Sequence, residues 1–325
     1  MSRFLNHWHP VRFHDPGSKR PYFEGWYFKM VSKDRKHKLA FIPGVFLNGK
    51  DNDHSFIQIL DGSHLTTYHR FSYEAFHAQA NPFSVSIEKN YFSLETLVLN
   101  MNGDSRRIQG ELHFKNRYPW PVRLLSPGAM GWYAFVPTME CYHGILSMDH
   151  AVEGTLKIDG RDVDFSGGRG YMEKDWGVSF PLAYVWLQCN HFYRQNISIM
   201  VSIARIPWKQ SAFRGFIIGL LMKDRLIRLT TYTGAVIDHL SISDREVSIT
   251  AHDRRLQMKL KAKRSAGGTL YGPDGTQMHQ HVSESLCSEV VLTVREKDQM
   301  IFRGTGYPAA LEVHGPFTEL LDQES

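Results

Sequence analysis

The chain has 325 residues, of which 42% are hydrophobic and 22% charged, and this composition excludes a chain that is disordered over most of its length. The formal net charge of +5 permits contact with an anionic membrane surface or nucleic acid but requires neither. Aromatic residues make up 13% of the sequence, which is enough to line a pocket as well as to fill a core.

The cysteine content and the apolar segments of the sequence indicate in which cellular compartment the protein is expected. The 3 cysteines lack zinc-type spacing and predict neither a disulfide framework nor a structural metal site. Residues 1–16 contain no apolar stretch typical of a signal peptide, and the longest apolar run, 216–222, is too short to span a bilayer. We therefore expect a cytoplasmic protein that meets membranes only from outside.

Short segments with β-type alternation follow one another along the chain. Residues 83–87 alternate at period two, and residues 156–165 do so around Asp159-Gly160, a dipeptide typical of two-residue hairpin turns. Further strands are predicted at 197–203, 247–251, 256–262 and 290–294. Long windows keep no helical period, and one short helix is expected at 317–321. The sequence predicts an all-β protein.

The spacing of these strands also bears on domain organisation. Short strands separated by turns favour barrels or sandwiches over a parallel sheet, and the chain is long for one small barrel. The glycine cluster at 166–170 is the best candidate boundary. We therefore expect two consecutive β-barrel domains, 1–168 and 169–325.

The segment 170–190 is rich in candidate functional side chains. Glu173, Lys174 and Asp175 lie among aromatic residues, and such surroundings raise the pKa of a carboxyl group unless a lysine pairs with it. After Pro181, alternation places four residues on one strand face: Tyr184, Trp186, Gln188 and Asn190. This face could line a pocket, although a charged turn beside an ordinary hydrophobic strand explains the pattern equally simply.

Two further segments place a carboxylate among aromatic residues. In 22–28, Glu24 shares a strand face with Tyr22, Trp26 and Phe28, and in 131–143 Glu140 follows several aromatic residues. An acid on an aromatic face is costly unless it is paired, protonated or directed into a pocket. A buried Glu24 paired with Arg or Lys is the alternative to a functional acid.

Four ordered motifs resemble the tocopherol cyclase family. They are Tyr22-Phe-Glu-Gly-Trp-Tyr, Gly131-Trp-Tyr with Pro137 and Glu140-Cys141, Glu173-Lys-Asp-Trp-Gly177 with Phe180-Pro181, Trp186 and Gln188-Cys-Asn190, and Ala310-Leu-Glu-Val-His-Gly315. The resemblance covers roughly residues 20–315 and implies two tandem lipocalin-like antiparallel β-barrel domains with very few helices. It also implies a cofactor-independent cyclase that closes the chromanol ring of a prenylated hydroquinone. The plant enzymes carry asparagine where this chain has Asp175.

Such a ring closure needs an acid, a shielded carbocation and a phenolic oxygen. A carboxylic acid in an apolar pocket can protonate the prenyl double bond, and aromatic faces can stabilise the cation by about 0.5–2 kcal/mol each. Our hypothesis is that Asp175 or Glu173 is the proton donor, with Glu24 as the competing candidate. The residues expected to bind substrate are Trp26, Tyr27, Trp132, Glu140, Trp176, Trp186, Gln188 and Asn190. Among them, Tyr27, Gln188 and Asn190 would orient the hydroquinone oxygens.

Two other functions are compatible with the same sequence features. An isoprenoid hydratase of the same fold, or a lipid carrier with the pocket but without the acid chemistry, would share most of these features. We expect no metal, because the histidine pairs of the chain lack an acidic ligand at nearby spacing, and the resemblance implies that no cofactor is needed. Lys259, Lys261 and Lys263 form a basic strand face that is solvated or touches anionic lipid. The expected partner is a hydrophobic small molecule, and not nucleic acid.

Overall fold

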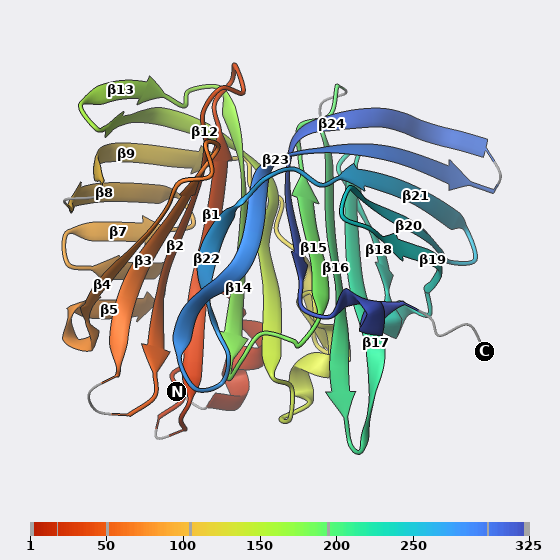
Figure 1. The fold of residues 1–325 in the computed structure, drawn as a ribbon, viewed down its shortest axis with the longest axis horizontal. Helices are drawn as coiled ribbons and strands as arrows, with labels where there is room; N and C mark the ends of the chain where they lie inside the picture. Colours follow the sequence, from red (N-terminus) through yellow and green to blue (C-terminus); the bar gives the residue numbers. More distant parts are fainter. Residues whose placement is uncertain are drawn as a thin grey trace. The chain divides into compact units, whose positions relative to one another are not determined.

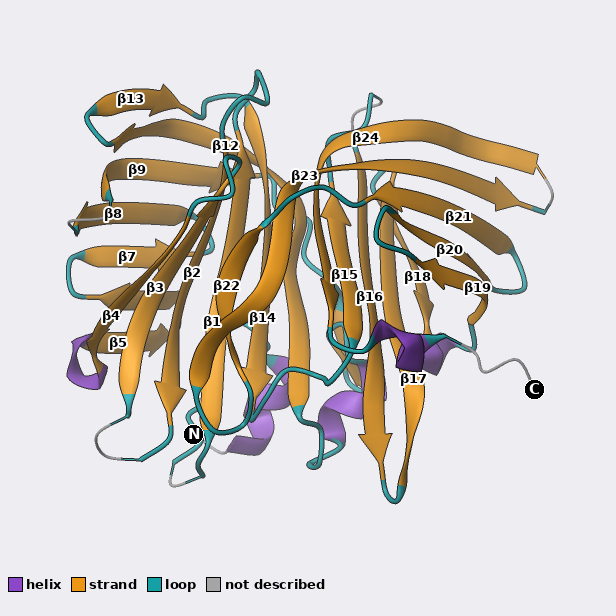
Figure 2. Cartoon of the chain, in the orientation of Figure 1, coloured by secondary structure: helices purple, strands orange, loops and turns teal. Residues whose placement is uncertain are grey.

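The computed structural model describes residues 3–17, 19–49, 52–103, 106–193, 196–297 and 299–321. Strands make up most of this part of the chain (Figure 2), and its helices are short 3-10 segments. These are η1 (Arg3–Trp8), η2 (Tyr73–Ala75), η3 (Gly131–Phe135), η4 (Thr231–Thr233) and η5 (Phe317–Leu320). The all-β prediction is confirmed, and the helix expected at the C-terminus is η5.

The chain forms two compact units. Unit 1 comprises Met1–Phe180 and Thr269–His281, and unit 2 comprises Pro181–Gly268 and Val282–Ser325. The structure thus divides the chain at Phe180 and not at the glycine cluster near Gly168. The reason is strand β14 (Gly168–Gly177), which begins in that cluster and pairs with two strands of unit 1.

Unit 1 is built on one large antiparallel sheet. Its strand order is β4-β3-β2-β1-β14-β12-β9-β8-β7-β6-β5, and β13 pairs with β12. In Figure 1, strands β7 to β9 run across the direction of β1 to β4, so the sheet curves strongly. The strands are β1 (Tyr22–Val31), β2 (Lys38–Leu47), β3 (His54–Asp61), β4 (Thr66–Ser72), β5 (Phe76–Ala80), β6 (Phe83–Ile87), β7 (Asn90–Ser93), β8 (Thr96–Asn102), β9 (Arg107–Lys115), β12 (Cys141–Ile158), β13 (Arg161–Asp164) and β14. A separate hairpin is formed by β10 (Val122–Arg123) and β11 (Ser126–Pro127).

One face of this sheet encloses the core of unit 1. Side chains from nearly every strand meet there, including the fully buried Trp26, Phe41, Ile57 and Phe92. The predicted strand 83–87 is β6, and the predicted Asp159-Gly160 turn joins β12 to β13. Both turn residues have positive φ, 49° and 86°, as this type of hairpin requires.

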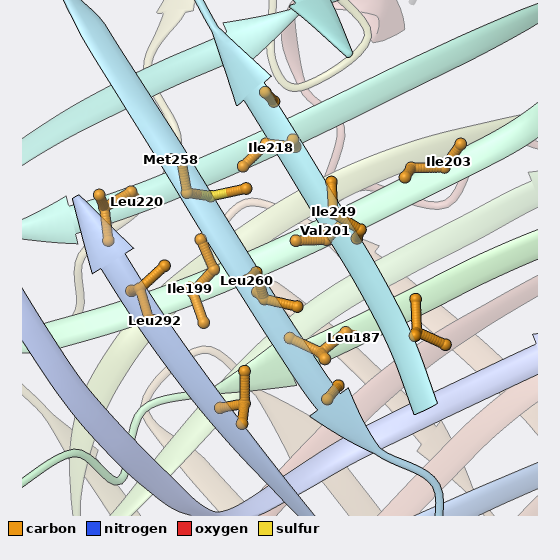
Figure 3. Close-up of a cluster of buried hydrophobic side chains, with 14 of the residues drawn as sticks. Leu187, Ile199, Val201, Ile203, Ile218, Leu220, Ile249, Met258, Leu260 and Leu292 are labelled. Carbon is orange, nitrogen blue, oxygen red and sulfur yellow. The ribbon is translucent and has the colours of Figure 1, made fainter. Parts of the chain in front are cut away.

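Unit 2 contains a second antiparallel sheet with its own core. The strand order is β18-β17-β16-β15-β24-β23-β21-β20-β19, and β22 pairs with β23. The strands are β15 (Tyr184–Cys189), β16 (Ile197–Trp208), β17 (Ser211–Met222), β18 (Arg225–Thr230), β19 (Val236–Ile242), β20 (Glu246–His252), β21 (Leu256–Lys263), β22 (Gly268–Pro273), β23 (Met278–Glu296) and β24 (Gln299–His314). Aliphatic side chains such as Leu187, Val201 and Leu260 point toward one another between the strands (Figure 3). The four strands predicted between residues 197 and 294 are all confirmed.

Residues 269–281 return to unit 1 after the chain has built most of unit 2. The backbone amide of Tyr271 donates to Gln58 Oε1 at 2.6 Å, and Gln58 Nε2 donates to the Tyr271 carbonyl at 3.2 Å. The ring of Tyr271 stacks on Tyr68 at 4.4 Å. This segment therefore lies against the sheet face opposite the core of unit 1.

Candidate active site

Three adjacent strands of unit 1 carry most of the predicted functional residues. β14 lies between β1 and β12, and paired residues of neighbouring antiparallel strands point to the same side. Trp26 pairs with Lys174, whereas Gly25 pairs with Asp175 and His143 pairs with Asp175 from the other side. The residues consequently separate into two clusters on opposite faces of one sheet.

The cluster on the core face, the lysine cluster, consists of Lys174, Glu24 and His14. Lys174 and Glu24 are both fully buried and form an ion pair through Nζ and Oε1. Lys174 Nζ also donates to the Arg12 carbonyl and contacts His14 Nδ1 at 2.6 Å. Because His14 Nε2 faces the carbonyl of Asn6, which can only accept, Nδ1 is the acceptor for Lys174.

Aromatic rings complete the lysine cluster. Lys174 Nζ lies 4.9 Å from the ring centroid of Trp26 and 4.6 Å from that of Trp176, within cation–π range. His14 stacks on Trp176 at 4.2 Å, and Tyr22 donates its hydroxyl proton to Glu24. Trp26 and Trp176, expected to line a carbocation pocket, instead enclose this buried lysine.

The electrostatics of the lysine cluster keep Glu24 ionised. Burial alone would raise the pKa of Glu24, but the charge of Lys174 outweighs it and holds the pKa below its ordinary value. The backbone amide of His14 also donates to the two carboxylate oxygens at 3.0 and 3.1 Å. Burial lowers the pKa of Lys174 to about 8, although Glu24 acts in the opposite direction. Glu24, the competing candidate for proton donor, is therefore a carboxylate paired with a lysine. A buried Glu24 paired with Arg or Lys was the alternative to a functional acid in the sequence analysis.

The opposite face carries the histidine cluster, formed by His143, Asp175 and Glu173. His143 Nδ1 lies 2.8 Å from Asp175 Oδ1, and its Nε2 lies 3.6 Å from Glu173 Oε2. The fully buried Tyr171 donates its hydroxyl proton to Glu173 Oε2 at 2.5 Å. The Asp175 side chain is 26% exposed, against 6% for Glu173, so Asp175 is the more accessible acid.

The two carboxylates decide the charge of His143. Burial alone would lower the pKa of His143, but Asp175 and Glu173 together raise it to about 9. At neutral pH the ring is therefore an imidazolium that donates through Nδ1 to Asp175. The cluster holds one transferable proton between a histidine and an accessible carboxylate.

Apolar side chains adjoin the histidine cluster on the same face. Phe23, Phe46 and Phe56 form a buried group with which Cys141 and Phe180 are in contact. Cys141 Sγ lies 3.8 Å from Asp175 Oδ1, and burial, followed by the charge of Asp175, raises the pKa of this thiol far above its ordinary value. The thiol therefore stays protonated, and the acid is in a medium of low polarity.

The remaining predicted residues are spread over the chain. Tyr27 pairs with Glu173 and shares the face of the histidine cluster. Glu140 directly precedes β12, and burial raises the pKa of its carboxyl group. Trp132 is 44% exposed on η3. Trp186, Gln188 and Asn190 belong to unit 2, where they alternate with Val185, Leu187 and Cys189 of its core, as the strand pattern predicted.

Sequence reasoning missed two important partners. His143 is the last residue of the segment 131–143, in which only Glu140 was considered as a functional residue. Its pairing with Asp175 across the strands shows that it belongs to the candidate site. Lys174 was considered only as a possible partner of a neighbouring carboxylate, yet strand geometry directs it to the other face of β14, where it reaches Glu24. Neither the strand at Gly168–Gly177 nor the partners across the strands had been predicted from the sequence.

The histidine cluster also has the donor set of a metal site. The ligand atoms of His143, Glu173 and Asp175 lie within 4.8 Å of one another, an arrangement that, in the part of the chain described, is found in this group alone. A nitrogen and two carboxylate oxygens suit a small divalent cation. The same atoms are already satisfied in part by a shared proton, so a cation would have to displace it.

Fold and site together define a class of protein: a lipocalin-like, all-β chain of two antiparallel β units, the first of which holds a buried acid–base cluster. A family model described as tocopherol cyclase-like matches residues 93–315. The chain belongs to this tocopherol cyclase-like family, and its named relatives indicate an enzyme.

Two of these relatives are plant proteins. A probable chloroplastic tocopherol cyclase of Oryza sativa subsp. japonica is 23% identical over an alignment that is 377 residues long with its gaps. The alignment covers 93% of this chain and 77% of the rice protein. The chloroplastic tocopherol cyclase of Zea mays is 21% identical over 277 residues, which cover 69% of this chain and 58% of the maize protein.

Solved structures share the fold at low sequence identity. CghA with Sch210972 superposes with a TM-score of 0.54 at 12% identity, covering 91% of this chain and 89% of CghA. Kievitone hydratase from Nectria haematococca superposes with a TM-score of 0.51 at 13% identity, covering 91% of this chain and 88% of the hydratase.

Among the described residues, no helix has the length and apolar character that crossing a membrane requires.

Proposed function

We propose that the protein closes the chromanol ring of a prenylated hydroquinone, without a cofactor, by protonating the prenyl double bond. The observation that carries this proposal is the contact of His143 Nδ1 with Asp175 Oδ1 at 2.8 Å, next to a buried group of phenylalanine side chains. The family to which the chain belongs supports the reaction type.

The proposed proton donor is the His143–Asp175 pair, in which Asp175 receives the imidazolium proton of His143 and delivers it to the substrate. The proton adds to the alkene carbon nearer the aromatic ring, and the electron pair of the double bond forms the new C–H bond. The tertiary carbocation that results is captured by the phenolic oxygen, which closes the ring. The phenolic proton then returns to the Asp175–His143 pair, so substrate and product are isomers and the acid is restored.

The charge of the histidine cluster favours this sequence. An imidazolium with two carboxylates carries a net charge of −1, which becomes −2 when the proton leaves. The negative charge therefore grows as the carbocation forms, in an apolar environment where electrostatic stabilisation is strong. Tyr171 holds Glu173 as the carboxylate that keeps His143 charged.

The first test is incubation with 2,3-dimethyl-5-phytyl-1,4-hydroquinone under reducing conditions, followed by chromatography. We expect chromanol from the wild type and a loss of about 10²–10⁴-fold in Asp175→Asn, the usual contribution of a general acid. Glu173→Gln separates the two acids. The matched control is Asp162→Asn, an exposed β13 carboxylate whose side chain is 70% exposed, and it should keep full turnover.

Three outcomes contradict the proposal in different ways. Full turnover in Asp175→Asn would remove this residue as the acid. A tertiary alcohol in place of chromanol would show that water captures the cation, and the protein would be a hydratase. Saturable binding of the quinol without any product would indicate a carrier.

A further inference from the structure

An exposed apolar hairpin precedes the strand that carries His143. Leu124 and Leu125 form the two-residue turn between β10 and β11 and are 74% and 79% exposed. Two-residue hairpin turns ordinarily use glycine, asparagine or aspartate, so two leucines at these positions are unusual. Val122 at 42% and Trp132 at 44% extend the exposed apolar surface. We refer to Val122, Leu124, Leu125 and Trp132 as the leucine tip.

The leucine tip is held in place by neighbouring segments and does not fold back onto the core. Trp8 Nε1 donates to the Leu124 carbonyl at 3.0 Å, and the Trp8 ring packs against Phe135 at 5.5 Å. The ring of Trp132 stacks on Tyr133 at 4.0 Å. The hairpin therefore presents its leucines on a fixed base of aromatic rings, where tryptophan and tyrosine suit a membrane–water interface.

The sequence around the leucine tip is cationic and contains no carboxylate. Residues 116–139 include Arg117 and Arg123 but neither Asp nor Glu, and residues 3–14 include two arginines and again no acid. Arg117 pairs with Glu95 at 2.9 Å, whereas Arg123 is exposed and has no ion pair within the described chain. The apolar tip and the exposed Arg123 beside it complement an anionic lipid surface.

The lysine row that the sequence suggested for this role is largely neutralised. Lys261 pairs with Glu246 at 3.1 Å, and Lys263 pairs with Glu289 at 2.7 Å, both on neighbouring strands of unit 2. These lysines are thus ordinary cross-strand partners. The observations for a lipid contact favour the leucine tip instead.

We propose that the leucine tip inserts into the surface of an anionic lipid bilayer, with Arg123 at the level of the headgroups. The chain runs from this hairpin through η3 into β12, where His143 is the third residue. The tip and the histidine cluster are thus linked by a short stretch of unit 1. Resting on the proposed function, this contact would draw a lipid-dissolved prenylquinol from the bilayer, whereas the insertion itself does not depend on that function.

The test is co-sedimentation of the full chain with vesicles of pure phosphatidylcholine and with vesicles containing one quarter phosphatidylglycerol. Wild type should bind the anionic vesicles, and Leu124→Ser/Leu125→Ser should bind at least tenfold more weakly. Arg123→Gln should lose only the preference for anionic vesicles. A matched control is Val236→Ser/Met300→Ser, which removes two side chains that are 51% and 58% exposed in unit 2 and should bind like wild type.

Spectroscopy and turnover complete the test. Brominated lipid should quench the tryptophan fluorescence of wild type more strongly than that of Trp132→Phe, in which Trp8 still lies next to the hairpin turn. Equal vesicle binding by wild type and the double leucine variant would overturn the proposal, as would a dimer that the leucine substitutions dissociate in the absence of vesicle binding. Turnover of a water-soluble short-prenyl hydroquinone should be unaffected by the leucine substitutions. If no chromanol forms but leucine-dependent vesicle binding persists, the proposed function fails and the lipid contact stands.

Discussion

The protonation of His143 makes the stability of unit 1 depend on pH in a predictable direction. His143→Gln removes the titrating ring and keeps a polar side chain of similar reach. His143 faces Asp175 and Glu173 on β14 and is adjoined by the Cys141 thiol of its own strand, so the two carboxylates dominate its titration. Wild type should be stabilised over the variant at acidic pH and lose that advantage in mild alkali.

The magnitude follows from the folded and unfolded pKa values of one residue. Although burial opposes it, the pKa of His143 rises from 6.5 in the unfolded chain to about 9 in the folded protein. Each pH unit between these values contributes about 1.4 kcal/mol, so the proton stabilises the folded state by about 3 kcal/mol. Because the folded pKa is raised, this stabilisation is fully present below pH 6.5 and is lost as the pH rises through 9.

The assay is urea unfolding of wild type and His143→Gln at several pH values between 6 and 9.5, followed by tryptophan fluorescence. The quantity of interest is the difference in free energy of unfolding between the two proteins. Lys174 acts in the opposite direction, since its pKa is lowered to about 8, but it is present in both proteins and cancels in the difference. His113→Gln, at a ring that is 51% exposed, is the matched control for replacing a histidine by glutamine elsewhere in unit 1.

A difference that stays constant from pH 6 to 9.5 would refute this reasoning. It would mean that Asp175 and Glu173 do not hold a proton on His143, and the acid–base cluster would lose its charge argument. A difference that falls by about 3 kcal/mol would establish the imidazolium independently of any substrate.

Three further substitutions test an ion pair and a hydrogen bond within unit 1 and the packing of the core within unit 2. Glu24→Gln should lower the free energy of unfolding by about 3–5 kcal/mol, because it leaves Lys174 buried without a counter-charge, and adding Lys174→Met should restore part of the loss in urea titrations. Tyr171→Phe should cost about 1–3 kcal/mol by removing a donor to buried Glu173; an unchanged urea midpoint would contradict the hydrogen bond. Leu260→Ala should cost about 2–5 kcal/mol and increase amide exchange in unit 2, whereas faster exchange confined to unit 1 would argue against separate cores.

Local pattern predicted much of the fold. Alternation identified β6, the hairpin between β12 and β13, and four strands of unit 2, because residues two apart in a strand face the same side whatever the strand pairs with. The boundary between the two units was not predicted correctly from local sequence pattern. The glycine cluster near Gly168 looks like a linker in sequence, yet it opens β14, and residues 269–281 return to unit 1 after a long excursion.

The candidate site shows the same division. By itself, the sequence determined that Glu173, Lys174 and Asp175 are adjacent and that aromatic residues surround all three, but not that they lie on a strand. Only the tertiary structure decided that Lys174 neutralises Glu24 and that His143 shares a proton with Asp175. The physical reason is that side-chain direction is set by backbone geometry within a few residues, whereas the partner of a charge depends on which distant strands pair and in which register.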